Sequence, residues 1–243
     1  MAKALKIKNL VKNYGDMQAL KNINLEVQDW DFFALLWINW AGKTTIIGIV
    51  TDLVNKTSGT VKIFGTDIDT DFPKAKELIW VVPQEFNMDI FSKVIDVITT
   101  QAGYYGIPKQ EALVNAEKYL KVLGLWEKRD ARIMELSGWM KRRAMIARAL
   151  AHDPKLLILD EPTAGVDINL RKSTYQFLLE LNKAGTTILL TTHYLEEVEK
   201  LCNAFAVIDK GEIIINTSKK EFLKDKKWSL SSELEDVFEN LTQ

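Results

Sequence analysis

Short runs of hydrophobic residues, separated by turn residues, dominate the first seventy positions of the chain. This pattern is typical of β-strands, and it predicts strands at Leu5–Val11, Ile23–Val27 and Thr60–Phe64. The continuous apolar run Phe32–Leu36 predicts a strand that is buried on both faces. Helical periodicity begins shortly afterwards, at Thr44–Val54. The sequence therefore predicts a buried strand that leads through a short loop into a helix.

The rest of the chain alternates predicted helices and strands. Residues from about 89 to 150 have helical periodicity, with turn signals at Gly103, Gly106–Pro108 and Gly124. The elements expected after them are a strand at Leu156–Leu159, a helix at Asn169–Asn182, a strand at Thr186–Leu190, a helix at Tyr194–Leu201 and a hairpin at Ala204–Asn216 that turns at Lys210 and Gly211. Residues 218–243 are polar and predicted to be helical. Strands and helices that alternate in this way favour an α/β fold with a mostly parallel core sheet.

Composition narrows the class of protein. The 243 residues are 47% hydrophobic and 27% charged, as in globular proteins. Thirty-two basic residues balance 33 acidic ones, so no excess of positive charge favours nucleic acid as a partner. A single cysteine, Cys202, excludes an internal disulfide, and the sequence shows neither a signal peptide nor an apolar run of membrane-spanning length. These features predict a cytoplasmic protein.

Two acidic residues end the strand in the segment LLILDEP, Leu156–Pro162. Carboxylates at the carboxyl end of a buried strand lie where α/β sheets bind ligands. Asp160 is suited to holding the Mg²⁺ of a nucleotide through water, and Glu161 to polarising an attacking water. The alternative is a core strand followed by a solvated acidic turn.

Half of a phosphate-binding loop follows the strand Phe32–Leu36. Ala41, Gly42, Lys43, Thr44 and Thr45 match the second half of the pattern G-x-x-x-x-G-K-[ST] and open a helix. In such loops the backbone N–H groups and the helix N-terminus surround phosphate groups. Lys43 would reach the outer phosphates, and the Thr44 hydroxyl would bind Mg²⁺. The first glycine of the pattern is replaced by Trp37.

The order of the motifs resembles that of the ATP-binding subunits of ABC transporters over nearly the whole chain. The motifs that carry the resemblance are Tyr14, the phosphate loop, Gln84 in VVPQ, Ser137 and Gly138 in ELSGWMKRR, Asp160 and Glu161, Asp167 in AGVD, and His193 in TTHYLEE. The resemblance implies a P-loop NTPase of the ABC type, with a mostly parallel core sheet, an antiparallel β subdomain and an α-helical subdomain. It implies an ABC ATPase domain at 1–217, with its helical subdomain at about 89–150, and a short C-terminal helical extension at 218–243.

The same resemblance implies a role for each matching residue. Glu161 and His193 would be catalytic. Nucleotide binding would involve Tyr14, Asn39, Ala41, Gly42, Lys43, Thr44, Thr45, Ser137, Gly138 and Asp167. Thr44, Gln84 and Asp160 would hold Mg²⁺. Simpler readings stay open for several residues: Tyr14 as an exposed turn aromatic, Gln84 as a surface residue, and Ser137 as the N-cap of the helix Met140–Leu150.

Five tryptophans occupy positions where the family pattern has glycine, namely Trp30, Trp37, Trp40, Trp80 and Trp139. The substitutions match the composition, since 12 glycines are present where about 7% would give roughly 17. A bulky residue in a left-handed conformation costs on the order of 1–3 kcal/mol. Two such residues in the phosphate loop, at a combined ~3–6 kcal/mol, would weaken binding about 10²- to 10⁴-fold. Trp139 would hold two subunits apart, Trp30 would add modest strain, and Trp80 suits either a damaged site or a packed strand.

The resemblance implies ATP and Mg²⁺ as ligands, a membrane permease as partner, a head-to-tail homodimer across ATP, and a position at the inner face of the cell membrane. The tryptophans at positions 37, 40 and 139 predict that this chain is defective in ATP binding, in dimer closure and in hydrolysis. One alternative is a non-hydrolysing scaffold subunit that docks on a permease. Another is a non-transport ABC ATPase; the lack of a coiled-coil insertion or second ATPase domain, and a net charge of −1, count against it.

Overall fold

Two β-sheets and a group of helices build the structure, a computed structural model that describes residues 3–37, 42–164, 168–224 and 229–242. The larger sheet has the strand order β10-β9-β3-β8-β7-β6. Its strands from β9 to β6 are parallel, and β10 pairs antiparallel with β9. Its strands are β3 (Phe32–Trp37), β6 (Ile79–Val82), β7 (Leu156–Asp160), β8 (Thr187–Thr192), β9 (Ala204–Asp209) and β10 (Glu212–Ser218). The predicted parallel core sheet is confirmed.

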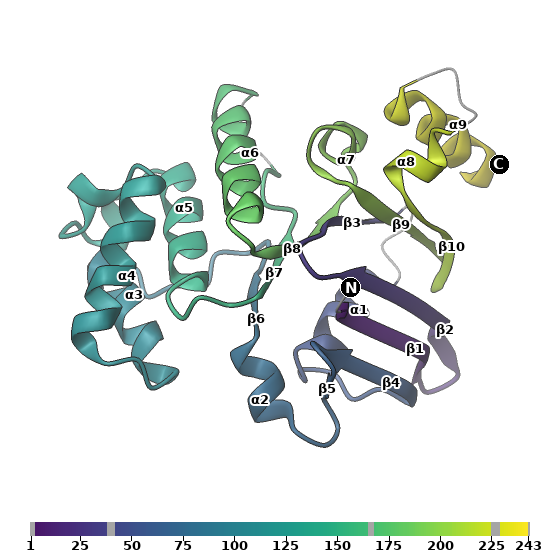
Figure 1. The fold of residues 1–243 in the computed structure, drawn as a ribbon, viewed down its shortest axis with the longest axis horizontal. Coiled ribbons are helices and arrows are strands. Elements are labelled where there is room, and N and C mark those ends of the chain that lie inside the picture. The colour runs from purple at the N-terminus through teal and green to yellow at the C-terminus, as the bar shows by residue number, and fades with distance from the viewer. Residues whose placement is uncertain (1–2, 38–41, 165–167, 225–228, 243) are drawn as a thin grey trace.

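The smaller sheet is antiparallel and has the strand order β2-β1-β4-β5. Its strands are β1 (Lys3–Tyr14), β2 (Met17–Gln28), β4 (Ser58–Ile63) and β5 (Thr66–Asp67). In Figure 1 this sheet lies below and to the right of the parallel sheet. The three predicted strands of this region are present, and β1 and β2 are longer than the apolar runs because their ends pair with each other beyond the buried part.

The helices connect the strands of the parallel sheet and form a group beside it. The helices are α1 (Lys43–Val50), α2 (Phe72–Glu77), α3 (Val94–Tyr104), α4 (Lys109–Val122), α5 (Gly138–Ala149), α6 (Ile168–Lys183), α7 (Leu195–Leu201), α8 (Lys219–Phe222) and α9 (Leu230–Thr242), with short 3₁₀ turns at Trp126–Lys128 and Ile133–Glu135. Helices α3, α4 and α5 pack together to one side of the sheets (Figure 1). The predicted helical stretch from about residue 89 to 150 therefore contains three separate helices.

The side chains of β3 alternate between two hydrophobic cores, as the two-residue period of a strand requires. Phe32, Ala34 and Leu36 pack with the helices on one face of the parallel sheet. Phe33, Leu35 and Trp37 pack on the other face, with α1 and the smaller sheet. This explains why the run is continuously apolar, and it places Trp37 on the same side of the sheet as α1.

The short helix α2 is absent from the predictions. Asp71 caps it by accepting a hydrogen bond from the Lys74 N–H, and a proline lies in its first turn. An aspartate cap with a proline two residues later, in the first turn, is a recognised start signal, so this helix could have been found. Its six residues are too few for a helical period to stand out.

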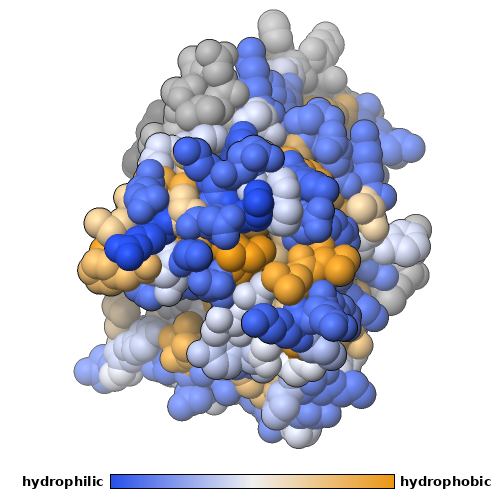
Figure 2. Space-filling view, turned by 90° about the vertical axis from the view of Figure 1, so that its left-hand side faces the viewer, coloured by the Kyte–Doolittle hydropathy of each residue, from blue (hydrophilic) through white to orange (hydrophobic). Residues whose placement is uncertain are grey.

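The outer face of the helical group is largely hydrophilic, with scattered apolar patches (Figure 2). Exposed apolar side chains of α4 include Leu113, Val114 and Val122. Within the described residues, no helix has the length and apolarity needed to cross a membrane.

Candidate functional site

Lys43 lies at the carboxyl end of the parallel sheet, next to the end of β7. Gly42 precedes α1 with φ +111°, a conformation that side chains strain. A Cβ at this position would come within 2.9 Å of the end of the Ile208 side chain, which can shift, so it is the φ angle that favours glycine here. Lys43 is the first residue of the helix, and Thr44 is exposed beside it. The predicted strand and the helix that follows it are present; positions 38–41 of the phosphate loop lie outside the described residues.

The Lys43 ammonium group is held by the two carboxylates that end β7. Its Nζ atom lies 3.0 Å from Asp160 Oδ1 and 2.9 Å from Glu161 Oε1. Only 2% of the Lys43 side chain and 3% of the Glu161 side chain are exposed. Removing one partner of a buried ion pair destabilises a fold strongly, because the remaining charge is then buried without a counter-charge. We call Lys43, Asp160 and Glu161 the lysine–carboxylate cluster.

Two further predicted residues contact Glu161. The Gln84 side-chain amide donates a hydrogen bond to Oε2 over 3.3 Å, and Nδ1 of His193 lies 3.5 Å from the same oxygen. Glu161 itself has φ +46°, a left-handed conformation that costs on the order of 1–3 kcal/mol. Its N–H donates to the carbonyl of Thr191 on β8. The fold thus brings Gln84 and His193 to the lysine–carboxylate cluster.

Trp37 fills the space beside this cluster. Its side chain belongs to the apolar core and the residue is 4% exposed. The centre of its ring system lies 4.0 Å from Lys43 Nζ and 6.0 Å from the centre of the His193 ring. A cation over the face of an indole is attracted by the ring quadrupole. The indole therefore lies against Lys43 and near His193, which the resemblance links to the outer phosphates and to catalysis, respectively.

The strain expected at Trp37 is not found, and that expectation was wrong. Trp37 is the last residue of β3 and pairs with Ile208 of β9, so its backbone is extended. At this position it is the volume of the indole beside Lys43, and not backbone strain, that stands in the way of a phosphate. Trp40, Asn39 and Ala41 lie outside the described residues, as does Asp167.

The remaining substituted positions differ from one another. Trp30 has φ +66° and is 68% exposed, so the modest strain predicted for it is present. Trp80 lies in β6 and packs edge-on against Tyr105 and His152, whose rings stack 3.7 Å apart. Of the two readings of Trp80, the structure favours the packed strand. Trp139 is half-buried in the first turn of α5, with the guanidinium carbon of Arg143 4.9 Å from its ring centre.

The oxygen donors expected for Mg²⁺ are compatible with that ion. Thr44 and Asp160 line the same cavity, which has a volume of about 620 Å³. Gln84, the third residue expected to hold Mg²⁺, is not among the described residues that line it, and its side-chain amide donates to Glu161. Hydroxyl and carboxylate oxygens are hard ligands of the kind that Mg²⁺ prefers. Among the described residues, no group of three or more histidine, cysteine or acidic side chains is arranged to hold a metal ion.

Ser137 caps α5 by accepting a hydrogen bond from the Met140 N–H, as the simpler reading predicts. Gly138 begins the same helix. Helix α5 packs on α3 and α4, and no hydrogen bond between described residues joins Ser137 to the lysine–carboxylate cluster. Tyr14, at the end of β1, is 44% exposed, with the Lys12 ammonium 4.5 Å from its ring centre.

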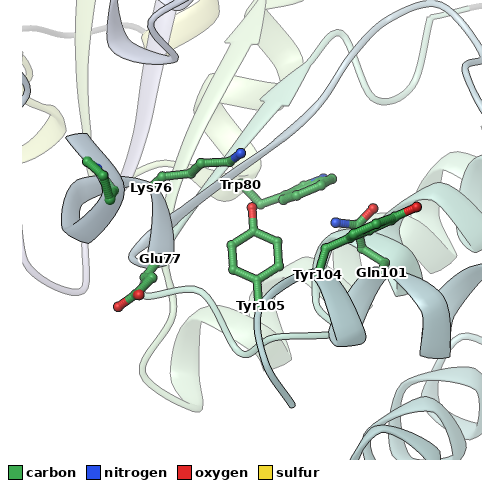
Figure 3. A pocket seen from close by; sticks show the side chains of 7 residues that line it. Lys76, Glu77, Trp80, Gln101, Tyr104 and Tyr105 are labelled. Carbon is green, nitrogen blue, oxygen red and sulfur yellow. The ribbon is translucent and has the colours of Figure 1, made fainter. Parts of the chain in front are cut away.

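A second pocket, of about 480 Å³, lies between α2, β6 and the end of α3. Figure 3 shows Lys76, Trp80 and Tyr105 converging from these three elements, with Tyr104 and Gln101 at the side. Lys76, Trp80 and Tyr105 also line the 620 Å³ cavity, so the two hollows share a wall.

Two residues near the site were missed by the sequence analysis. Thr191 donates a hydrogen bond from its hydroxyl to Asp160 Oδ1, and the strand register pairs these two residues. Parallel strands place their carboxyl ends together, so the segment TTH could have indicated it. Arg142 on α5 donates to backbone carbonyls of the segments that carry Gln84 and Glu161. No sequence motif indicates hydrogen bonds from a side chain to distant backbone carbonyls.

A strand-loop-helix unit with a lysine at the helix start, beside an acid-ended parallel strand, defines a P-loop nucleotide-binding domain. Residues 20–164 match the family model described as "ABC transporter". This chain belongs to the ABC transporter ATP-binding family and has the mixed-sheet fold that was predicted from the resemblance.

Relatives and solved structures agree with this assignment. The chain is 41% identical over 214 residues to Nod factor export ATP-binding protein I of Cupriavidus metallidurans, covering 88% of this chain and 71% of that one. It is 38% identical to linearmycin resistance ATP-binding protein LnrL of Bacillus subtilis, covering 86% and 68%. An ATP-binding cassette of an ABC transporter in its ADP conformation superimposes with a TM-score of 0.81 at 26% identity, covering 93% and 94%. An ATP-binding subunit with a TM-score of 0.87 at 23% identity, covering 99% and 100%, supports the fold.

Proposed function

We propose that this chain is the ATP-binding subunit of an ABC exporter, acting on a separate membrane permease, and that its ATP binding and hydrolysis are impaired by tryptophan. The direction of transport is taken from the relatives named for Nod factor export and linearmycin resistance. The subunit would be cytoplasmic and would lie at the inner face of the membrane through its permease. The impairment is inferred from this chain's own residues.

One observation carries the impairment: the Trp37 indole lies against Lys43 in a buried position. A phosphate that is to contact Lys43 has to displace this ring. It also has to draw the ammonium group away from Asp160 and Glu161, which hold it at 3.0 and 2.9 Å. Both changes cost free energy, and the displacement of the ring is a cost that a loop with glycine at this position would not have.

The catalytic carboxylate is enclosed as well. Glu161 is the residue best placed to activate a water, yet its oxygens contact Lys43, Gln84 and His193. As a general base it would need a water within hydrogen-bond reach. Hydrolysis therefore requires these side chains to rearrange around Glu161. Trp40 and Trp139, at a loop and a signature position, would add to the loss, with Trp139 hindering closure of a head-to-tail dimer.

The test is magnesium-dependent release of phosphate from ATP, measured for two chains. One is the unmodified chain and the other carries Trp37→Gly, Trp40→Gly and Trp139→Gly; each is compared with its own Glu161→Gln variant. We expect the unmodified chain to match its Glu161→Gln control and the glycine-restored chain to exceed its control. Saturable turnover by the unmodified chain above its control would refute the impairment.

A non-hydrolysing subunit that docks on a permease is the second candidate. The feature that favours it is the apolar character of the 620 Å³ cavity, whose wall includes Phe72, Trp80 and Leu53, the last 83% exposed. Contiguous exposed apolar surface beside polar residues marks sites of protein contact. Capture of a permease by the chain without measurable ATP binding would support this candidate.

A further inference from the structure

The guanidinium group of Arg142, on α5, is fully used in hydrogen bonds to backbone carbonyls. Its Nη1 atom donates to the carbonyls of Pro83 and Gln84 over 2.7 and 2.8 Å. Its Nη2 atom donates to those of Asp160 and Glu161 over 3.1 and 2.7 Å. Nε donates to the carbonyl of Pro162 over 3.2 Å. The five N–H donors of an arginine thus meet five acceptors.

The five acceptors belong to two segments that are distant in sequence. One segment follows β6 and carries Gln84. The other begins at Asp160, the last residue of β7, and carries Glu161. A third element, α5, supplies the arginine. It begins at Gly138, is capped by Ser137 and carries the motif ELSGWMKRR, which we call the signature. Arg142 is therefore a single rigid connection between the signature helix and both segments whose side chains contact the lysine–carboxylate cluster.

From this geometry we infer that Arg142 is a positioning residue, which fixes the backbone of residues 83–84 and 160–162 so that Gln84 and Glu161 face the reaction centre. The backbone of Glu161 gives the strongest support for this role. Its backbone is left-handed at φ +46°, and such a conformation persists only where surrounding contacts enforce it. Its N–H is fixed by the Thr191 carbonyl and its carbonyl by Arg142. Both ends of the strained residue are thus held.

The chemistry of the guanidinium explains why arginine suits this role. Its donors are arranged in a flat, rigid fork, whereas a lysine has three donors on a flexible stem. Burial lowers the pKa of the Arg142 guanidinium, and the Asp160 and Glu161 carboxylates act in the opposite direction. The neighbouring Arg143 makes a useful contrast, because its donors go to the Leu123 carbonyl and the Ser173 hydroxyl, away from both segments.

The inference rests on the ATPase activity in the proposed function, so its test has two independent arms. The first is amide hydrogen exchange of the unmodified chain, compared for Arg142→Lys and Arg143→Lys. We expect Arg142→Lys to speed exchange about tenfold or more in peptides that contain residues 83–84 and 160–162, and little elsewhere. Arg143→Lys should leave both peptides unchanged. Equal exchange in the two variants, or a uniform increase over the whole chain, would overturn the inference.

The second arm measures kcat and KM for ATP in the glycine-restored chain. We expect Arg142→Lys to lower kcat about tenfold or more with KM changed less than threefold, and Arg143→Lys to leave both unchanged. A kcat equal to that of Arg143→Lys would overturn the role. If the glycine-restored chain itself has no turnover, the proposed function fails, and hydrogen exchange alone decides on Arg142. If Arg142→Lys does not fold, Arg142→Gln takes its place; failure of both to fold would show a purely structural role and count against the inference.

Discussion

Replacing Trp37 by glycine should raise the affinity for ATP while lowering the stability of the fold. The two effects have the same origin, which is the burial of one indole. The ring is 4% exposed, packs in the core beside α1 and faces Lys43 at 4.0 Å. In the unmodified chain the ring has to leave this position before a phosphate can contact Lys43, and in Trp37→Gly it does not.

The size of the effect follows from the area involved. A buried aromatic side chain removes about 150–250 Å² from water. At about 25 cal/mol per Å² this amounts to about 4–6 kcal/mol, which the unmodified chain has to spend on ring displacement. Each 1.4 kcal/mol is a factor of ten, so Trp37→Gly should bind ATP about 10³- to 10⁴-fold more tightly. Without nucleotide it should lose about 3–5 kcal/mol of unfolding free energy, as other truncations of buried tryptophan do.

Equilibrium dialysis with labelled ATP and Mg²⁺ measures the affinity, and urea unfolding measures the stability. Trp126→Gly is the matched control, because Trp126 is a partly buried tryptophan in the helical group, faced by Arg129. It should lose stability without a gain in affinity. In Trp37→Gly, saturating ATP should recover stability in proportion to RT ln(1 + [ATP]/Kd). An affinity unchanged by Trp37→Gly would refute the displacement argument.

Three further predictions concern stability. Lys43→Met should lower the unfolding free energy by about 3 kcal/mol in urea, because Asp160 and Glu161 then lose the cation between them; an unchanged midpoint would contradict this. Burial lowers the pKa of His152 to about 4 from an ordinary value near 6.5, so the unfolded chain takes up the proton before the folded chain does. The unfolding free energy should therefore fall by up to about 3 kcal/mol as pH drops from 6.5 to 4. His152→Phe keeps a ring stacked on Tyr105 and should flatten this pH dependence, as measured by urea unfolding at each pH. Trp30→Gly should raise the thermal midpoint and add about 1 kcal/mol to the unfolding free energy, because glycine adopts φ +66° without strain. A lower midpoint would show that the exposed indole stabilises the fold by more than its backbone strain costs.

The sequence predicts the parts of this protein whose signals are local or periodic. The run Phe32–Leu36 and the segment LLILDEP identify buried strands because their apolar residues are contiguous. The resemblance places Gln84, Glu161 and His193 at one site, and the fold brings all three together. Ser137 illustrates a residue with two compatible readings: its capping role is confirmed, and its role toward a partner subunit stays a prediction.

Features that depend on three-dimensional neighbours were not predictable. Strain was expected at Trp37 from the glycine pattern, but the pairing with Ile208 keeps its backbone extended. The left-handed backbone of Glu161 is fixed by Thr191 on a later strand, and the carbonyl contacts of Arg142 join residues that are 18 to 59 positions apart in sequence. Side-chain identity says little about such contacts, because backbone carbonyls are present at every residue.

The ion pairs of Lys43 have a consequence for the order in which ligands can enter. One ammonium group stands against two carboxylates, and the Arg142 guanidinium adds a second positive charge beside them. The charges of these four side chains are therefore balanced without a ligand. A phosphate that takes the Lys43 ammonium for itself leaves the buried carboxylates short of a cation, which costs free energy. A divalent cation that arrives with the phosphate would supply the missing charge, so we expect a nucleotide to enter this site together with its metal ion.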